Sequence, residues 1–284
     1  MLTLRELFRV DPVSFFLRLL VRAAAAVTAL LMTFLVGYIL IRGAPHITPD
    51  LFAPRYTSEN VSLLPALVNT VLMAGLSLAL AVPFGVCAAI WLAEYAKRGN
   101  KLVAAVRLAA ETLSGIPSII YGLFGMLMFV MAFGWGYSLL SGAFTLAIMI
   151  LPLMMRATEE ALLAVPDMYR EGSFGLGAGK LRTVFSIVLP AAAPGILAGV
   201  ILSTGRIVGE TAALIFTAGT VAELPKTALS STRTLSVHLY ILANEGFHTE
   251  QAYATAVVLL LVVLGINGLS AYAAKRVGRL GGSK

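Results

Sequence analysis

The chain has 284 residues, of which 59% are hydrophobic and only 12% are charged, and its formal net charge is +7 at pH 7. This is more apolar side chain than a soluble globule of this size can bury, so the composition excludes a soluble protein and predicts an all-α polytopic membrane protein. The positive charge requires no nucleic-acid partner, because Lys and Arg gather on the cytoplasmic side of membrane proteins.

Five uncharged runs are candidates for membrane-spanning segments: 23–41, 61–93, 112–155, 183–205 and 251–274. A spanning helix needs about 20 mostly apolar residues. The third run is too long for one span, and it is interrupted at 134–137 by Gly-Trp-Gly-Tyr, a tight turn whose aromatic residues suit a membrane interface. The sequence therefore predicts six transmembrane helices.

Basic residues predict the orientation, because cytoplasmic loops carry an excess of Lys and Arg. Most of them precede the first span, follow the second or the fourth, or close the chain: Arg5, Arg9, Arg18, Arg22, Lys97, Arg98, Lys101, Arg107, Arg156, Arg170, Lys180, Arg182, Lys275, Arg276, Arg279 and Lys284. Both termini are therefore expected to be cytoplasmic. The first apolar run is too long, and too poorly followed by a cleavage site, for a removable signal peptide, so it is predicted to stay as an anchor.

The sequence offers no chemistry of its own for an energy source or a metal. A phosphate-binding G-x-x-x-x-G-K-[ST] loop is missing, since Gly179-Lys180 is followed by Leu181. The three histidines lack ligand spacing, and the single cysteine, Cys87, excludes an intrachain disulfide and a cysteine metal cluster. We expect no cofactor in this chain, no metal site and no enzymatic activity, but a transport reaction driven by a partner.

The polar stretch between the fourth and fifth spans predicts one short helix, at about 165–179. Pro166 suits the first helical turn, Asp167 suits its positive end, and three glycines at 175, 177 and 179 are placed to stop it. Its apolar side chains lie outside the bilayer, which usually indicates a partner: Met168, Tyr169, Phe174 and Leu176.

The spacing of Glu171, Gly177 and Ile187-x-Leu189-Pro190 resembles the E-A-A-x-x-x-G-x(9)-I-x-L-P signature of ABC importer permeases. The resemblance implies the type I importer permease fold and a cytoplasmic coupling helix that docks into a groove on a separate ATPase. The implied coupling residues are Met168, Tyr169, Glu171, Gly172, Ser173 and Gly177. Gly172 and Ser173 replace two alanines of the signature, and the alternative is a connecting helix that rests on its own subunit.

Arg206 and Glu210 are four residues apart at the edge of the fifth apolar run, where charged groups are costly unless they face a bundle interior or a watery cavity. On one helix face they could form a salt bridge. Alternatively, the guanidinium of Arg206 could offer paired donors to a phosphate or sulfate, with Glu210 orienting it or accepting a hydrogen bond from an anion that still carries a proton.

Two further segments are similar to segments of phosphate importer permeases. Gly205-Arg206-x-x-Gly209-Glu210-Thr211-Ala212 resembles A-R-x-x-G-E-T-A, and 115–122 resembles G-[VI]-P-S-[IV]-x-Y-G. The stretch 235–256 is more similar to the PstA type than to the PstC type. The resemblance implies a translocation pathway at Arg206, Glu210, Thr211, Pro117 and Ser118. Pro117 and Ser118 would either open a helix end toward the pathway or form a simple kink.

The resemblance implies a permease subunit of an ATP-driven phosphate importer in the bacterial inner membrane. The expected partners are a PstC-like permease in a heterodimer, two copies of an ATPase that bind ATP and Mg, and an external phosphate-binding protein. The chain is divided into an N-terminal part with the first helix and an outer loop (1–60), a permease core (61–276) and a cytoplasmic tail (277–284).

Three alternatives remain open. Another oxyanion, sulfate or molybdate, would fit the same class of permease. A channel or secondary transporter should show repeat symmetry or paired broken helices, which the sequence does not reveal. A scaffold that only tethers an ATPase gives no reason for the Arg206 and Glu210 charges. The outer segment 223–250 could re-enter the membrane, cover the pathway or receive a binding protein.

Overall fold

The computed structural model describes residues 12–97 and 99–281, and these residues form helices and irregular connections without a strand. The prediction of an all-α chain is confirmed. Four basic residues used for the orientation lie outside the described residues, as does the rest of 1–11 and 282–284: Arg5, Arg9, Arg98 and Lys284.

The helices follow one another in a single series, with the short η elements being 3-10 or π-helical. In chain order they are α2 (Pro12–Gly43), η1 (Ala44–His46), η2 (Pro49–Phe52), α3 (Leu64–Ile90), η3 (Trp91–Tyr95), α4 (Lys101–Ser114), α5 (Ser118–Gly125), η4 (Met126–Ala132), α6 (Leu139–Leu163), α7 (Asp167–Gly175), α8 (Lys180–Thr183), η5 (Val184–Val188), α9 (Leu189–Gly209), α10 (Ala212–Ile215), α11 (Leu235–Glu245) and α12 (Thr249–Gly281).

Among the described residues, five helical stretches are long and apolar enough to cross a membrane, and the bent pair of α4 with α5 and η4 makes a sixth if it forms one span. The predicted six is the upper end of this count, but the expected third helix starting near residue 112 is wrong. The chain becomes helical at Lys101, because the side chain of Asn100 accepts a hydrogen bond from the backbone of Leu102 and caps α4. After Ser114 the chain turns by 101° into α5.

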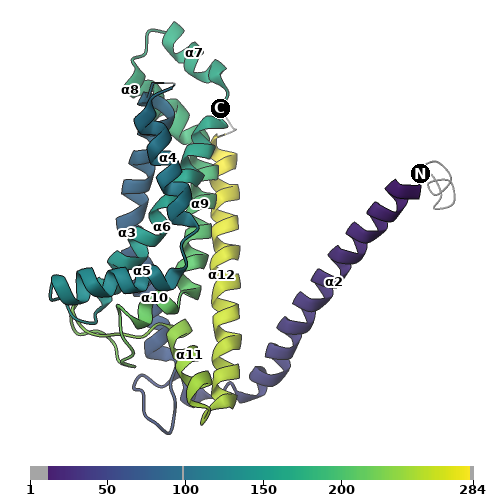
Figure 1. Ribbon diagram of the computed structural model, residues 1–284, viewed down its shortest axis with the longest axis vertical. Coiled ribbons are helices and arrows are strands. Elements are labelled where there is room, and N and C mark those ends of the chain that lie inside the picture. Colours follow the sequence, from purple (N-terminus) through teal and green to yellow (C-terminus); the bar gives the residue numbers. More distant parts are fainter. Residues whose placement is uncertain (1–11, 98, 282–284) are drawn as a thin grey trace.

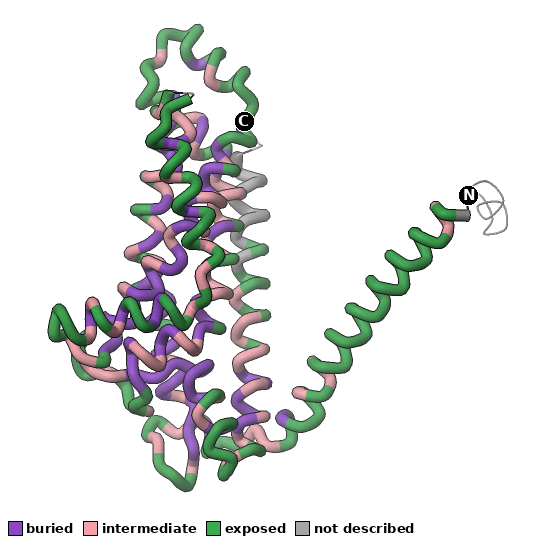
Figure 2. Tube along the Cα trace, in the orientation of Figure 1, coloured by how far each residue is buried: buried purple, intermediate pink, exposed green. Residues whose placement is uncertain are grey.

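Figure 1 shows how the spans are arranged. Helices α3, α4, α6, α9 and α12 run along the long axis of the bundle, whereas α5 lies across it. The helix α7 lies at one end of the bundle and α11 at the other, and we name these the α7 end and the α11 end. The helix α2 meets α12 at the α11 end and then diverges from the bundle. Nearly all of α2 is exposed, as Figure 2 shows.

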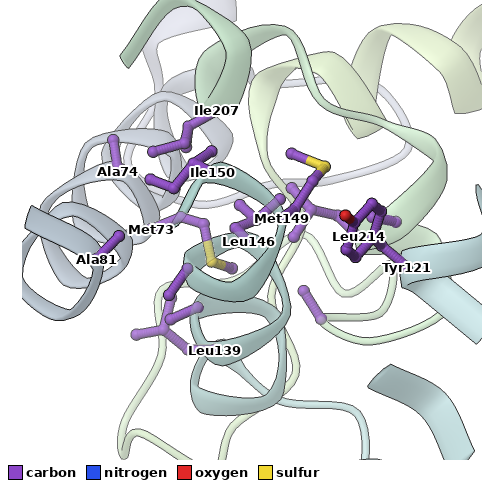
Figure 3. Close-up of a cluster of buried hydrophobic side chains, with 14 of the residues drawn as sticks. Met73, Ala74, Ala81, Tyr121, Leu139, Leu146, Met149, Ile150, Ile207 and Leu214 are labelled. Carbon is purple, nitrogen blue, oxygen red and sulfur yellow. The ribbon is translucent and has the colours of Figure 1, made fainter. Parts of the chain in front are cut away.

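The core nearest the candidate site is an apolar cluster on α3, α5, α6, α9 and α10 (Figure 3). Met73, Ile150 and Ile207 are almost completely buried in it. Close packing of α9 on α6 depends on Gly195 and Gly199, since a Cβ atom there would lie 2.6 and 2.8 Å from the Cβ atoms of two α6 alanines.

Candidate functional site

Two interrupted helices meet at the candidate pathway. Pro117, in extended conformation, precedes α5 and stops α4 from continuing through the bend. The second interruption follows Gly209, where α9 ends and Glu210 is extended before α10 begins. Beyond these breaks α5 and α10 pack together, because a Cβ atom on Gly122 would lie 2.8 Å from the Cα atom of Ala213. The two breaks are therefore parts of one local structure.

Arg206 lies in the last turn of α9 and is partly buried. It lines a groove of about 820 Å³ together with residues of α6 and α12, including Leu153 and Asn267. Within residues 12–97 and 99–281, no salt bridge or hydrogen bond engages the Arg206 side chain. The guanidinium donors therefore remain available to a ligand.

The salt bridge considered for Arg206 and Glu210 does not form, because α9 ends at Gly209 and the two residues do not share a helix face. Glu210 is 8% exposed, and its Oε1 accepts a hydrogen bond of 3.1 Å from the backbone N–H of Ala213. Its carbonyl oxygen accepts one of 2.6 Å from the Ser236 hydroxyl. Glu210 therefore caps α10 and ties the break to α11.

The remaining predicted pathway residues lie at the breaks. Pro117 is exposed, Ser118 is partly exposed as the first residue of α5, and Thr211 is partly exposed immediately before α10. Tyr121 connects the two sides of the α4–α5 break, since its hydroxyl donates a hydrogen bond of 2.8 Å to the Leu113 carbonyl. The sequence analysis did not single out Tyr121, although it belongs to the motif at 115–122 and a buried phenol needs a hydrogen-bond partner.

The predicted coupling helix is present as α7, shorter than expected at both ends. Gly177 adopts φ +80°, which ends the helical segment. Glu171 and Gly172 are exposed, and Figure 2 shows that most of α7 is exposed. The exposed fractions of its apolar side chains decide that α7 presents an apolar surface: Met168 70%, Tyr169 50%, Phe174 47% and Leu176 91%.

Ser173 differs from the other predicted coupling residues because it faces the bundle. It is 5% exposed, and its hydroxyl lies 2.8 Å from the hydroxyl of Thr183 at the end of α8. The small side chain thus allows α7 to pack on its own subunit. The outward surface of α7 is formed by exposed residues on either side of Ser173 in the sequence, such as Tyr169 and Phe174.

Arg170 holds α7 on the bundle, and sequence reasoning missed this role. Its guanidinium donates to Glu94 in η3, which continues α3, with 2.7 Å between Nη2 and Oε1, and also to Asp167 at 3.2 Å. It also donates to the carbonyl groups of Leu162 in the last turn of α6 and of Val165, two residues after this helix. Arg170 therefore connects α7 mechanically to two spans. No local pattern identifies a partner 76 residues away.

Five or six apolar spans, a pair of helix breaks beside an arginine, and an exposed apolar helix at one end are the features of a membrane transport subunit. Residues 81–279 match the family described as "Binding-protein-dependent transport system inner membrane component", and the chain belongs to this family of multi-pass inner-membrane proteins.

Two relatives extend over most of the chain. The "Probable ABC transporter permease protein YqgI" of Bacillus subtilis is 33% identical over 86% of this chain and 88% of its own length. The "Phosphate transport system permease protein PstA" of Haemophilus influenzae is 34% identical over 81% of this chain and 82% of its own length.

Solved structures show the same fold. A chain of a bacterial alginate ABC transporter matches with a TM-score of 0.67 and 17% identity, covering 92% of this chain and 96% of its own. A chain of the inward-facing methionine transporter MetNI matches with a TM-score of 0.59 and 20% identity, covering 76% of this chain and 94% of its own. The fold is that of a type I ABC importer permease.

Proposed function

We propose that this chain is a permease subunit of an ATP-driven phosphate importer and forms half of the translocation pathway. The observation that carries the proposal is Arg206, whose guanidinium has no carboxylate partner among the described residues and lies at the break between α9 and α10. A planar guanidinium matches two oxygens of a tetrahedral oxyanion. Relatives named as phosphate permeases support the choice of anion.

Each pathway residue then has a distinct role. Arg206 attracts and binds the anion, and Glu210 keeps α10 in place through the backbone of Ala213. Pro117 and Ser118 open the end of α5 beside this structure, and Thr211 adds a hydroxyl at the second break. Interrupted helices at membrane depth expose backbone groups to a passing ion, which continuous helices cannot do.

The energy comes from a partner in this proposal, since the chain is a transport subunit and not an enzyme. Two ATPase copies bind ATP and Mg, and one of them docks on the exposed surface of α7. The apolar side chains there are large enough for such a contact, with Leu176 91% exposed. Arg170 transmits the movement of α7 to α3 and α6. The contacting residues are Met168, Tyr169, Glu171, Gly172 and Gly177, with Ser173 supporting α7 from within.

A second permease of the PstC type completes the pathway. The helix α2 supports this pairing, because its apolar stretch is 0% buried in the subunit and its main contact with the bundle is with α12. A spanning helix detached from its own bundle can pack against a neighbouring subunit. An external phosphate-binding protein delivers the anion at the α11 end, which lies opposite the ATPase-docking surface of α7.

The α7 end is cytoplasmic in this proposal, together with both termini. Lys97 and Lys101 line one pocket with Asp167 and Arg170 of α7, and Lys180 begins α8, as expected from the excess of basic residues on the cytoplasmic side of membranes. The segment 223–250, including α11, then lies outside. It is the part of the subunit nearest to the binding protein.

Uptake by an Arg206→Ala variant tests the role of this residue. The complex reconstituted in vesicles should still assemble, but ATP-dependent phosphate uptake should fall about a hundredfold, because the bidentate charge-assisted hydrogen bonds of Arg206 contribute about 3 kcal/mol. Arg206→Lys keeps the charge without the bidentate geometry and should be intermediate. Normal uptake by Arg206→Ala would contradict the proposal, and competition by sulfate or molybdate would favour another oxyanion.

A further inference from the structure

A second arginine, Arg233, is buried at the α11 end without a counter-ion. It lies just before α11, is 4% exposed, and takes part in no salt bridge among the described residues. Its Nε and Nη2 atoms are buried and have no hydrogen-bond partner. Its guanidinium stacks on the ring of Tyr56 at 4.5 Å. Because arginine does not lose its proton in proteins, this buried charge needs compensation.

Residues linked to Arg233 by sequence, by a hydrogen bond to its carbonyl or by contact with Tyr56 also carry buried polar atoms without a partner. The structure contains seven buried side-chain polar atoms without a hydrogen bond in its described part, and six of them belong to Asn69, Thr232, Arg233 and His238. We name these four residues the Arg233 cluster. Asn69 Nδ2 donates 3.2 Å to the Arg233 carbonyl, and Tyr56 packs edge-on against His238. Such a concentration is unusual, since buried polar groups are normally satisfied.

The unpartnered atoms define the chemistry of a ligand. Nε and Nη2 lie along one edge of the guanidinium, and this edge donates in parallel to two oxygens of an oxyanion. Burial, together with the neighbouring Arg233 charge, lowers the pKa of His238 to about 3. His238 is therefore neutral near pH 7, and its imidazole, which lies beside the backbone of Val61, adds no charge to the cluster. The Thr232 hydroxyl is a further donor.

Asn69 distinguishes between oxyanions. Its free Oδ1 atom can only accept a hydrogen bond, so it requires a proton on the ligand. Inorganic phosphate carries a proton near neutral pH, whereas sulfate and a lipid phosphodiester carry none. Ordered water would satisfy the hydrogen bonds of the cluster, but it would not neutralise Arg233.

We propose that the Arg233 cluster is an oxyanion site that binds protonated inorganic phosphate at the α11 end, separate from Arg206. Tyr56 covers the site, since its partly exposed ring contacts both Arg233 and His238. Entry of phosphate therefore requires displacement of this ring. The cluster adjoins the pathway, because Ser236 on the same segment donates to the Glu210 carbonyl. Its role as the point where phosphate enters the pathway rests on the proposed function.

Equilibrium dialysis with radiolabelled inorganic phosphate tests the site in the full chain with its copurifying partners, in lipid-free detergent at pH 7. Arg233→Gln should weaken one class of phosphate binding at least tenfold. Arg55→Gln is the matched control, because Arg55 is an exposed arginine on the same loop as Tyr56, and this variant should bind like the parent protein. Equal binding by the parent and Arg233→Gln would mean that only ordered water occupies the cluster, and would overturn the proposal.

Thr232→Val keeps the charge and the shape of the cluster, so it decides the matter if Arg233→Gln does not assemble. Losing one hydrogen bond to an anion should weaken phosphate binding about tenfold. Unchanged affinity in Thr232→Val would contradict the site. Excess sulfate should displace little phosphate from the cluster, and equal displacement by sulfate would remove the role assigned to Asn69.

Two further experiments distinguish free phosphate from a lipid headgroup as the ligand, and distinguish failure of the site from failure of the proposed function. Anionic phospholipid added in nanodiscs should leave phosphate binding unchanged, whereas displacement by lipid would make the ligand a headgroup. Phosphate binding that depends on Arg233 in a complex without ATP-driven uptake would refute the proposed function and keep the site. ATP-driven uptake with phosphate binding indifferent to Arg233 would refute the site alone.

Discussion

Arg170→Met should destabilise the docking of α7, and the geometry sets the magnitude. The Arg170 and Glu94 side chains are 15% and 8% exposed, so their ion pair is largely removed from water. Arg170→Met leaves the Glu94 carboxylate buried without its counter-ion, and breaking a buried pair costs about 3–5 kcal/mol. Two main-chain carbonyls, of Leu162 and Val165, also lose a donor.

A double-mutant cycle isolates the contribution of the pair. Glu94→Leu leaves Arg170 with Asp167 and two carbonyls, so its cost should be smaller than that of Arg170→Met. The double variant removes both charges, and it should be less destabilised than the sum of the single variants by about 1–3 kcal/mol. Denaturation of the purified complex, followed by the fluorescence of Trp91 near Glu94, measures these differences.

The Arg107–Glu159 pair is the comparison. The Arg107 side chain is 50% exposed, although Glu159 is only 9% exposed, so truncation of Arg107 to methionine should cost less than Arg170→Met, because water reaches this pair from the Arg107 side. Additive effects of Arg170→Met and Glu94→Leu, within about 0.5 kcal/mol, would refute the reasoning. In transport assays the complex with the Arg170 variant should retain ATPase activity but lose phosphate uptake, because the ATPase would hydrolyse ATP without moving α3.

Three other perturbations have defined outcomes. Leu176→Asp should prevent copurification of the ATPase. The control variant Phe247→Asp, which changes an 86% exposed apolar residue at the other end of the bundle, should not, and equal loss in both variants would show that α7 is not the docking surface. Gly122→Val should lower the free energy of unfolding by about 1–3 kcal/mol, because the valine side chain would push α5 away from Ala213. Gly75→Ala, where an added Cβ atom meets nothing within 4 Å, should leave thermal stability unchanged or raise it, and a harmless Gly122→Val would contradict the close packing of α5 on α10. The pKa of His238 is lowered from 6.5 to about 3, so between these two pH values the unfolded chain binds a proton at His238 and the folded chain does not. The free energy of unfolding should therefore fall as the pH drops below 6.5, by about 2 kcal/mol at pH 5. His238→Gln should reduce this pH dependence, and an unchanged pH dependence would exclude a buried neutral His238.

The spans and the coupling helix could be predicted because they depend on local sequence. Runs without charge gave the number of spans, and the proline and glycines around 166–179 placed α7 within a few residues. The α4 helix was missed because its first turns carry Lys101 and Arg107, which a search for uncharged runs assigns to a loop. A membrane helix near an interface tolerates such residues.

The details of the site depend on tertiary structure. Glu210 leaves the helix after Gly209, and its hydrogen bond to Ala213 and the bond from Ser236 become visible only when α9, α10 and α11 are placed together. A four-residue spacing suggested a salt bridge because it assumed a continuous helix. The Arg170–Glu94 pair and the Arg233 cluster join segments far apart in the chain, which no periodicity in one sequence reports.

The measurement that tests the central claim most directly is uptake of radiolabelled phosphate into vesicles that contain this chain with its partner permease, ATPase and binding protein. The account predicts uptake that requires ATP and persists in excess sulfate or molybdate. Uptake that proceeds without ATP would contradict the assignment to an ATP-driven importer, and uptake abolished by sulfate or molybdate would contradict the assignment of phosphate.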